Sequence, residues 1–355
     1  MILSDAERQF VERMPKAELH VHLEGSVRPE TLLDLGARHG LHYPFGDAAG
    51  ARDWYRFRDF PHFVQVYMAI CDALRTPDDI ERVTYELGED AARQRIRYLE
   101  VIISPTSPLN PRTPATPDVY LAGSRAGAAR VLRDFGVRMQ FQVDGVRSRT
   151  PDDVLAVASW CADHAGDGLI GFNLGGMERG YPASRHAAAI ARARQAGLRV
   201  SLHAGETDGP ASIWDALTAG AERIGHGVTS VADPRLVEHL VAERVVLEVS
   251  PTSNLRLGVA PSYVEHPFRA LHDAGVPVTV NSDDPPMFGT TLTGEYLVLA
   301  EHQGFTLGEL VDVNLRAVRA AFLPEEERTV LEEAFATELE ALRRELSGVD
   351  PSEGA

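Results

Sequence analysis

Short apolar runs alternate along this chain with longer stretches whose apolar positions recur at helical spacing. Because parallel strands are covered on both faces, nearly continuous apolar runs are typical of them. Eight runs are predicted as strands: Ala17–Glu24, Arg97–Ser104, Val137–Asp144, Gly168–Gly175, Arg199–Glu206, Arg223–Gly227, Val245–Thr252 and Pro277–Asp284. Amphipathic stretches predicted as helices lie between them, among them Pro151–Ala165, Ser184–Ala196 and Pro234–Ala242.

Eight strands, each followed by a helix, give the element count of a (β/α)8 barrel, so we expect an α/β fold of the TIM-barrel type. A doubly wound open sheet is the competing fold. That fold usually has fewer strands and often a Gly-rich first turn, and no Gly-x-Gly-x-x-Gly follows the first strand here. The length of 355 residues is normal for one barrel, which predicts a single domain over residues 1–355.

Two segments break this rhythm and predict extra helices. Gly40–Thr76 is long and rich in aromatic residues, and it falls between strands one and two. At the mouth of a barrel it would form an apolar wall or lid, or simply pack two helices onto the barrel. Pro324–Ser347 has the pattern of a charged C-terminal helix with an apolar stripe. Asn110–Pro117 is predicted as an exposed loop and residues 348–355 as a flexible tail.

Charge and cysteine content exclude several classes of protein. Asp and Glu number 52 against 35 Lys and Arg, a net charge of −17, which repels nucleic acid and anionic membranes. Cys71 and Cys161 lie far apart, as in proteins of a reducing cytoplasm. The first residues lack a secretion pattern, and Ser4 with Glu7 predicts a capping box at a helix start. No apolar run is long enough to span a membrane.

His20 and His22 stand two residues apart on the first predicted strand. Residues at that spacing on a strand point to the same face, so both imidazoles can reach one cation. A single His-x-His is more often a pair of core or surface histidines. Its context therefore decides the interpretation.

In barrel enzymes the catalytic groups lie at the carboxyl ends of the strands. Strands five, six and eight end in His203-Ala204-Gly205-Glu206, Gly225-His226-Gly227 and Asn281-Ser282-Asp283-Asp284-Pro285. Taken singly, the glycine-flanked histidine is typical of a turn, and the Asp-Asp-Pro of a helix start. Their joint occurrence at one rim predicts a catalytic site.

Three imidazoles and one carboxylate form a ligand set that suits a borderline divalent cation such as zinc. His20, His22, His203 and Asp283 supply this set. Such an ion would activate a water molecule near neutral pH. His226 is then free to orient that water or to take its proton, and Glu206 could protonate a substrate nitrogen if an apolar pocket raises its pKa.

Four motifs together resemble the adenosine deaminase family: residues 15–25, 203–206, 223–227 and 281–285. The resemblance extends from about Pro15 to Phe322 and implies a barrel with one zinc ion that replaces the 6-amino group of a purine by oxygen, releasing ammonia. It implies the metal ligands His20, His22, His203 and Asp283, with Glu206, His226 and Asp283 as catalytic residues. Glu206 would protonate purine N1, and His226 would position and deprotonate the water. Asp284 would accept a hydrogen bond from the N7 side, and the backbone of Gly176 would contact N3.

Departures from the family pattern concern the sugar side of the site. Glu24 stands where adenosine deaminases usually have the Asp that holds the ribose 5′-hydroxyl, and Glu there resembles the adenine deaminase branch. Strand four reads Gly-Phe-Asn-Leu-Gly-Gly-Met-Glu in place of the usual Gly-Phe-Asp-Leu-Ala-Gly-Asp-Glu, and Ser250–Asn254 is also nearer to divergent members. A related branch acts on 6-aminodeoxyfutalosine, whose benzoate-bearing arm could lie along Gly40–Thr76 and meet Arg56 or Arg58. We therefore expect a small purine substrate: adenosine, 6-aminodeoxyfutalosine or free adenine.

Two hypotheses from other classes remain. A catalytically silent binding module of this family should have lost Glu206 or a metal ligand and usually carries a secretion signal; this chain retains all of these residues. A two-metal amidohydrolase would often place a carboxylated lysine at the end of strand four, where this chain has Asn173 and Gly175. The sequence does not indicate an oligomeric state.

Overall fold

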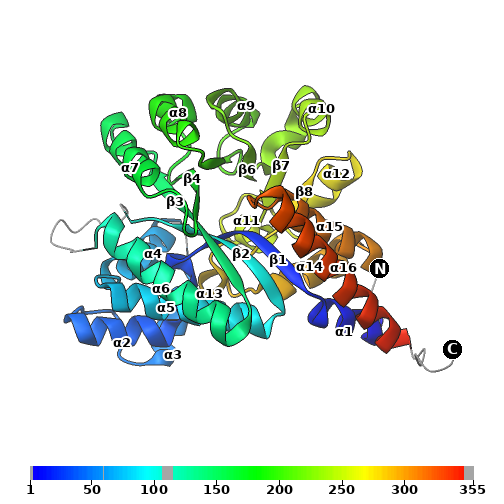
Figure 1. Cartoon of the computed structure of the whole chain (residues 1–355), viewed down its shortest axis with the longest axis horizontal. Helices are drawn as coiled ribbons and strands as arrows, with labels where there is room; N and C mark the ends of the chain where they lie inside the picture. The colour runs from blue at the N-terminus through cyan, green and yellow to red at the C-terminus, as the bar shows by residue number, and fades with distance from the viewer. Residues whose placement is uncertain (1–2, 59, 106–114, 348–355) are drawn as a thin grey trace.

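The computed structural model describes residues 3–58, 60–105 and 115–347. Its eight parallel strands follow one another in sequence order around the sheet (Figure 1). They are β1 Lys16–His22, β2 Ile96–Ile103, β3 Arg138–Val146, β4 Leu169–Gly175, β5 Arg199–Ala204, β6 Arg223–His226, β7 Val246–Val249 and β8 Val278–Val280. The predicted TIM-type (β/α)8 barrel is confirmed, and the open sheet is not.

The chain just after β8 closes the barrel against β1. Val21 forms a parallel bridge with Asp283, and His22 N donates to Asp283 O over 2.9 Å. Two residues before Val21 on β1, Leu19 N donates to the side-chain oxygen of Asn281 over 3.0 Å. The two sequence motifs that are farthest apart along the chain thus meet as hydrogen-bonded neighbours.

Helices surround the strands of the barrel (Figure 1). They are α1 Asp5–Arg13, α2 Pro29–His39, α3 Ala48–Tyr55, α4 Phe60–Ala73, α5 Pro77–Arg93, α6 Pro117–Phe135, α7 Pro151–Asp163, α8 Ala187–Gln195, α9 Pro210–Ala219, α10 Pro234–Ala242, α11 Pro251–Arg256, α12 Phe268–Asp273, α13 Pro285–Phe288, α14 Leu292–Gln303, α15 Leu307–Ala320 and α16 Glu325–Ser347, with the 3-10 turns η1 Glu24–Ser26, η2 Ala183–His186 and η3 Val228–Ala232. None of the described helices is long and apolar enough to cross a membrane.

Local sequence signals explain where many helices begin. The predicted capping box of Ser4 and Glu7 opens α1, and boxes built on Thr76, Thr150 and Thr306 open α5, α7 and α15. In several helices the residue after the cap is proline, whose fixed φ suits the first helical position. The predicted helix Pro234–Ala242 is found with the same bounds as α10.

The extra helices lie where the sequence placed them. Between β1 and β2, the segment with α3 and α4 forms a wall in which Phe57 and Phe63 pack on Phe288, with ring centroids 5.7 and 5.6 Å apart. Phe288 belongs to α13, which directly follows Asp284, so this wall stands beside the candidate site. The expectations of packed helices and of an apolar wall are both met.

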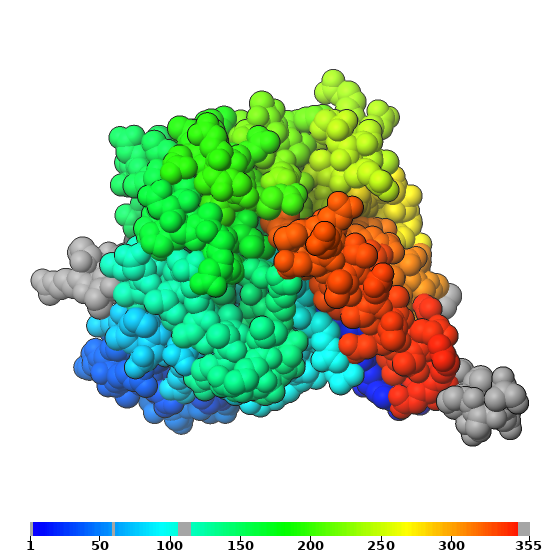
Figure 2. All heavy atoms as spheres, viewed as in Figure 1, coloured from blue at the N-terminus to red at the C-terminus, as the bar shows by residue number. Residues whose placement is uncertain are grey.

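At the other end of the chain, α16 crosses one face of the molecule and ends beside α1 (Figure 2). Arg13 and Glu345 join the two helices with an ion pair of 2.7 Å. Most of the predicted loop Asn110–Pro117 and the predicted tail 348–355 lie outside the described residues.

The interior of the barrel is polar, unlike the layers of Val, Ile and Leu that usually fill such barrels. Arg223 lies at its centre, ion-paired with Glu100 and, over 2.6 Å, with Glu248. The guanidinium also lies 3.4 Å from the ring centroid of Phe322. Because these groups are buried and mutually bonded, the network fixes the orientation of Glu248, which reaches up to the candidate site.

Candidate functional site

At the mouth of the barrel, the Nδ1 atoms of His20 and His203 are held by hydrogen bonds. His20 Nδ1 lies 2.9 Å from Glu248 Oε2, and His203 Nδ1 lies 2.9 Å from Asn173 Oδ1. Since both partners are acceptors at these atoms, each ring nitrogen Nδ1 carries the proton and each Nε2 presents a lone pair. A histidine held by a carboxylate or amide oxygen in this way is prepared to bind a metal.

The free nitrogens converge with a carboxylate on one point. His22 Nε2 is 3.3 Å from both His203 Nε2 and Asp283 Oδ1, and His20 Nε2 is 3.4 Å from the same oxygen. His20 Nε2 is buried and has no hydrogen-bond partner. An orphaned lone pair among these groups is costly unless a cation lies there, so the residues fit a divalent metal of the N/O-binding type.

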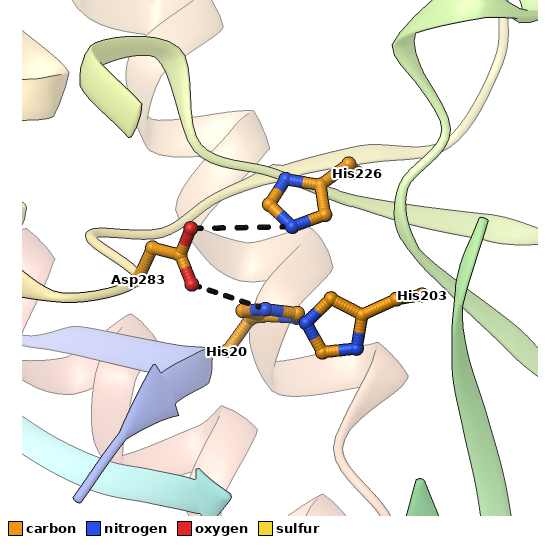
Figure 3. A group of neighbouring side chains, drawn as sticks. All are labelled: His20, His203, His226 and Asp283. Carbon is orange, nitrogen blue, oxygen red and sulfur yellow. Dashed lines mark ion pairs between the residues drawn. The ribbon is translucent and has the colours of Figure 1, made fainter. Parts of the chain in front are cut away.

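His226 stands on the same rim (Figure 3). In the part of the chain that the structure describes, a group able to offer one ligand atom each within 4.8 Å consists of His20, His203, His226 and Asp283. His22 is not in that group, yet its contacts with His203 and Asp283 are shorter than the 3.9 Å from His226 Nε2 to Asp283. All five side chains that the sequence singled out for metal and water therefore meet here.

Backbone conformation aims two of these side chains. Asp283 and His226 both have φ of +64°, a left-handed conformation that non-glycine residues rarely adopt. His226 is the last residue of β6, and Asp283 lies three residues after β8, where the turn redirects the side chain across the mouth. Ser253 Oγ donates to Asp283 Oδ2 over 2.7 Å and fixes that carboxylate. Strain of this kind clusters at functional sites.

Glu206 follows β5 on a loop and lies 3.8 Å from His226 Nε2. Burial raises the pKa of Glu206 above the usual value of a glutamate. A raised pKa favours the protonated carboxyl, the form that a general acid requires. Glu206 thus lies beside the histidine–carboxylate cluster, and its role as an acid stays a prediction.

The loop of Glu206 is held by Glu178, a residue that the sequence analysis did not single out. The carboxylate of Glu178 accepts hydrogen bonds from four consecutive backbone N–H groups, at positions 205 to 208. Burial favours its protonation, but the bonds from Ser212, Asp208 and Gly205 outweigh it and lower its pKa. Glu178 is the last residue of the strand-four signature, so the signal was present in the sequence without an assigned role.

The remaining predicted substrate residues follow the carboxyl ends of β1, β4 and β8. Asp284 is buried and its Oδ1 has no hydrogen-bond partner. Gly25 lies so close that a Cβ there would be 1.7 Å from this oxygen, which explains a glycine at that position. Glu24 is buried and accepts from Ser104 N over 2.8 Å, and burial raises its pKa to about 7. Gly176 is exposed at the end of β4, with φ of +84°.

The arginines considered for a substrate carboxylate lie farther out. Arg56 and Arg58 are exposed and line an outer cavity of about 470 Å³ together with Phe45, Trp54 and His62. Arg56 also lies 3.6 Å from Asp53. Phe57, between the two arginines, belongs to the aromatic wall described above, so this cavity adjoins the wall rather than the metal cluster.

The histidine–carboxylate cluster at the mouth of a (β/α)8 barrel is a candidate metal site of the hydrolase type. A family model for adenosine deaminase matches residues 15–338, and the chain belongs to the adenosine deaminase family. The expected family resemblance is thus confirmed, and the chain is an enzyme, a hydrolytic aminohydrolase.

Relatives with different substrates in their names match almost equally well. The chain is 39% identical over 317 residues to the aminodeoxyfutalosine deaminase of Streptomyces coelicolor, covering 88% of this chain and 81% of the other. It is 38% identical over 319 residues to the adenine deaminase of Rhizobium leguminosarum bv. trifolii, covering 90% and 98%.

Solved structures agree with the fold. An adenine deaminase from Arthrobacter aurescens superposes with a TM-score of 0.86 at 30% identity, over 92% of this chain and 99% of the other. An amidohydrolase from Burkholderia ambifaria with bound Zn superposes with a TM-score of 0.87 at 26% identity, over 98% and 96%.

Proposed function

We propose that this protein uses one zinc ion per chain to hydrolyse the 6-amino group of an adenine-containing small molecule, with 6-aminodeoxyfutalosine as its substrate. The observation that carries the proposal is the convergence of His20, His22, His203 and Asp283, with Glu206 beside them. These four residues would hold the ion. When bound, zinc would polarise a water molecule and lower its pKa toward neutrality.

Glu206 acts as the general acid. Its carboxyl delivers a proton to purine N1, which makes C6 electrophilic, and burial raises its pKa in the direction that this role needs. Glu206 lies close to His226, and this supports the two roles, because purine N1, which Glu206 protonates, and C6, which the water attacks, are neighbours in the ring. His226 orients the attacking water or takes its proton.

Asp284, Gly176 and Glu24 hold the substrate in register. The unpaired Oδ1 of Asp284 is available to the purine N7 edge, and its pKa is raised well above the usual value by burial and by the neighbouring charge of Asp283. A protonated Asp284 can donate to N7. The exposed backbone of Gly176 serves N3, and Glu24 lies on the side of N9 and its substituent.

The choice of 6-aminodeoxyfutalosine is supported by two features. The Streptomyces relative that bears this activity in its name shares 39% identity. The aromatic wall of Phe57, Phe63 and Phe288 is suited to a flat benzoate arm, and Arg56 and Arg58 lie beyond it at the outer cavity.

Free adenine is the second candidate. The Rhizobium adenine deaminase matches this chain at 38% identity over nearly its whole length, and the buried Glu24 is already engaged by Ser104 N. A carboxylate so engaged has less capacity for a sugar hydroxyl. This observation favours a substrate without a ribose.

Ammonia release from 6-aminodeoxyfutalosine, adenosine and adenine, measured side by side on zinc-loaded protein, tests the proposal. We expect the highest kcat/KM for 6-aminodeoxyfutalosine. A preference for adenine would select the second candidate, and no turnover of any of the three would refute the purine function although the family assignment would stand.

We also propose that the chain forms one domain and works in the cytoplasm on a small-molecule partner. Its free cysteines Cys71 and Cys161 are both buried, which suits a reducing compartment. Measuring the metal content of the purified protein would test the stoichiometry; about two ions per chain would favour a two-metal amidohydrolase.

A further inference from the structure

A line of buried hydrogen bonds leads from a backbone amide to His226. Phe268 N donates to His266 Nδ1 over 3.1 Å, and His266 Nε2 lies 3.1 Å from Asn254 Oδ1. Asn254 Nδ2 in turn lies 3.4 Å from His226 Nδ1. Asn254, His226 and His266 are exposed by 0%, 1% and 3%, so water does not offer alternative partners.

The direction of each bond follows from the first. A backbone N–H can only donate, so His266 Nδ1 is an acceptor and the single proton of a neutral ring lies on Nε2. Burial lowers the pKa of His266 to about 4, which keeps the ring neutral. His266 Nε2–H therefore donates to Asn254 Oδ1, and the other end of that amide, an N–H group, faces His226.

An amide N–H can only donate as well, so His226 Nδ1 must accept. Turning the amide of Asn254 over would place its N–H against the N–H of His266 in a buried site, which leaves donors without acceptors. The orientation of Asn254 is thus set by His266 and not by His226.

We propose that Asn254 and His266 are positioning residues that hold His226 in the tautomer with its proton on Nε2, directed at Glu206 and Asp283. The role for this tautomer rests on the proposed function. A resting His226 with Nε2–H donates a hydrogen bond to the attacking oxygen and orients it. To accept a proton at Nε2, His226 would first have to carry its own proton on Nδ1, where it would face the N–H of Asn254. The proton of the water therefore goes to a neighbouring carboxylate of the rim.

The isosteric change Asn254→Asp tests this directly. A carboxylate can only accept, so it would receive Nε2–H from His266 and Nδ1–H from His226, inverting the tautomer of His226. Nitrogen NMR of the full chain with ¹⁵N-labelled histidine distinguishes protonated from unprotonated ring nitrogens, and the spectrum of His226→Gln assigns the signal. We expect a protonated Nε2 in the parent protein, with and without zinc, and a protonated Nδ1 in Asn254→Asp.

Kinetics give a second readout. With the wrong tautomer, kcat should fall by about 100-fold or more, while KM changes much less; in serine proteases a wrong tautomer costs up to about ten-thousand-fold. His266→Phe removes the donor that orients Asn254, so His226 should show a mixture of tautomers. Asn314→Asp is the matched control, because Asn314 is an equally buried amide bonded to Ala17 N and Pro15 O at the opposite end of the barrel.

The control should leave the His226 spectrum unchanged. The proposal is overturned if the parent protein carries the proton on Nδ1, or if the tautomer is the same in Asn254→Asp. Should Asn254→Asp not fold, an unmixed Nε2–H signal in His266→Phe overturns it equally. The expected spectra in a protein that deaminates none of the three purines would refute the proposed function and leave this inference standing.

Discussion

At the scale of single residues, the sharpest test concerns the catalytic acid. Glu206→Gln keeps the shape of the side chain but removes its proton supply, so kcat should fall by about 10²–10⁴-fold with zinc retained. Activity assays with metal analysis of the same sample check this. If the kcat of this variant is within about tenfold of the parent value, Glu206 is not the general acid, because even modest general acid catalysis exceeds that factor.

The variant His203→Ala tests the proposed set of metal ligands. His203 is held by Asn173 and contributes a lone pair to the cluster, so its loss should abolish both activity and stoichiometric zinc. Zinc added to the metal-free parent protein should raise the unfolding temperature, since a ligand of the native state stabilises it by about 2.7 kcal/mol at a hundred times its Kd. Retention of one zinc by His203→Ala would show that the ligand set is misassigned.

The sequence predicted the site residues that a local pattern marks, either by their spacing or by their position along a strand. His20 and His22 stand out by their spacing, and Asp283 and His226 by their position at the ends of predicted strands. It did not find Glu178, Asn254 and His266, since their importance lies in contacts with loops far along the chain. Only the fold brings an ordinary glutamate or amide to a specific backbone group.

At the scale of elements, the sequence predicted the number and order of the strands but extended several of them too far. β5, β7 and β8 end at Ala204, Val249 and Val280, several residues before the predicted ends. Gly205 turns the chain with φ of +67°, and Pro251 begins α11 directly after β7. The residues beyond these ends, such as Asn281–Asp284, are mostly polar. Because the barrel interior is itself polar, a change in polarity does not show where strand pairing stops.

The loop after β5 depends on Glu178 for its shape. Glu178→Ala removes the acceptor of four backbone N–H groups, so Glu206 should no longer be fixed opposite His226. We expect kcat to fall by about 100-fold, the cost of a small misplacement of a catalytic group, with zinc still bound.

Asp79→Ala is the matched control for Glu178→Ala. Asp79 is also a buried carboxylate that accepts backbone N–H groups, from Arg75 and Thr76, but it lies at the start of α5 on the outside of the barrel. The Asp79→Ala variant should be less stable than the parent protein and should retain its kcat. An equal loss of kcat in both variants would mean that the effect of Glu178 is only structural.

At the scale of the whole molecule, the polar interior makes stability depend on pH. Burial raises the pKa of four carboxyl groups to about 7: Glu18, Glu24, Asp144 and Glu295. In the unfolded chain these groups titrate near 4.5 for Glu and 3.8 for Asp. Between those values and about 7, the native state holds protons that the unfolded state has lost, so the free energy of unfolding falls as pH rises.

Two buried histidines, His22 and His266, act in the opposite direction at lower pH. Burial lowers the pKa of His22 to about 3 and of His266 to about 4, so these rings add stability as pH rises toward their unfolded value of 6.5. Above pH 6.5 this gain is complete while the carboxyl groups are still titrating. We therefore expect the metal-free protein to lose stability between about pH 6.5 and 8.

Urea unfolding at several pH values measures this slope, and Glu295→Gln should flatten it. Glu295 accepts hydrogen bonds from Thr252 N over 3.1 Å and from Thr290 Oγ1 over 2.5 Å, away from the metal cluster, so the variant changes one titrating group without touching the ligands. Stability that rises over this range in the parent protein would mean that these carboxyl groups are ionised and paired in the native state. Ion pairs would then stabilise the polar interior of the barrel, as the pair of Arg223 with Glu248 does.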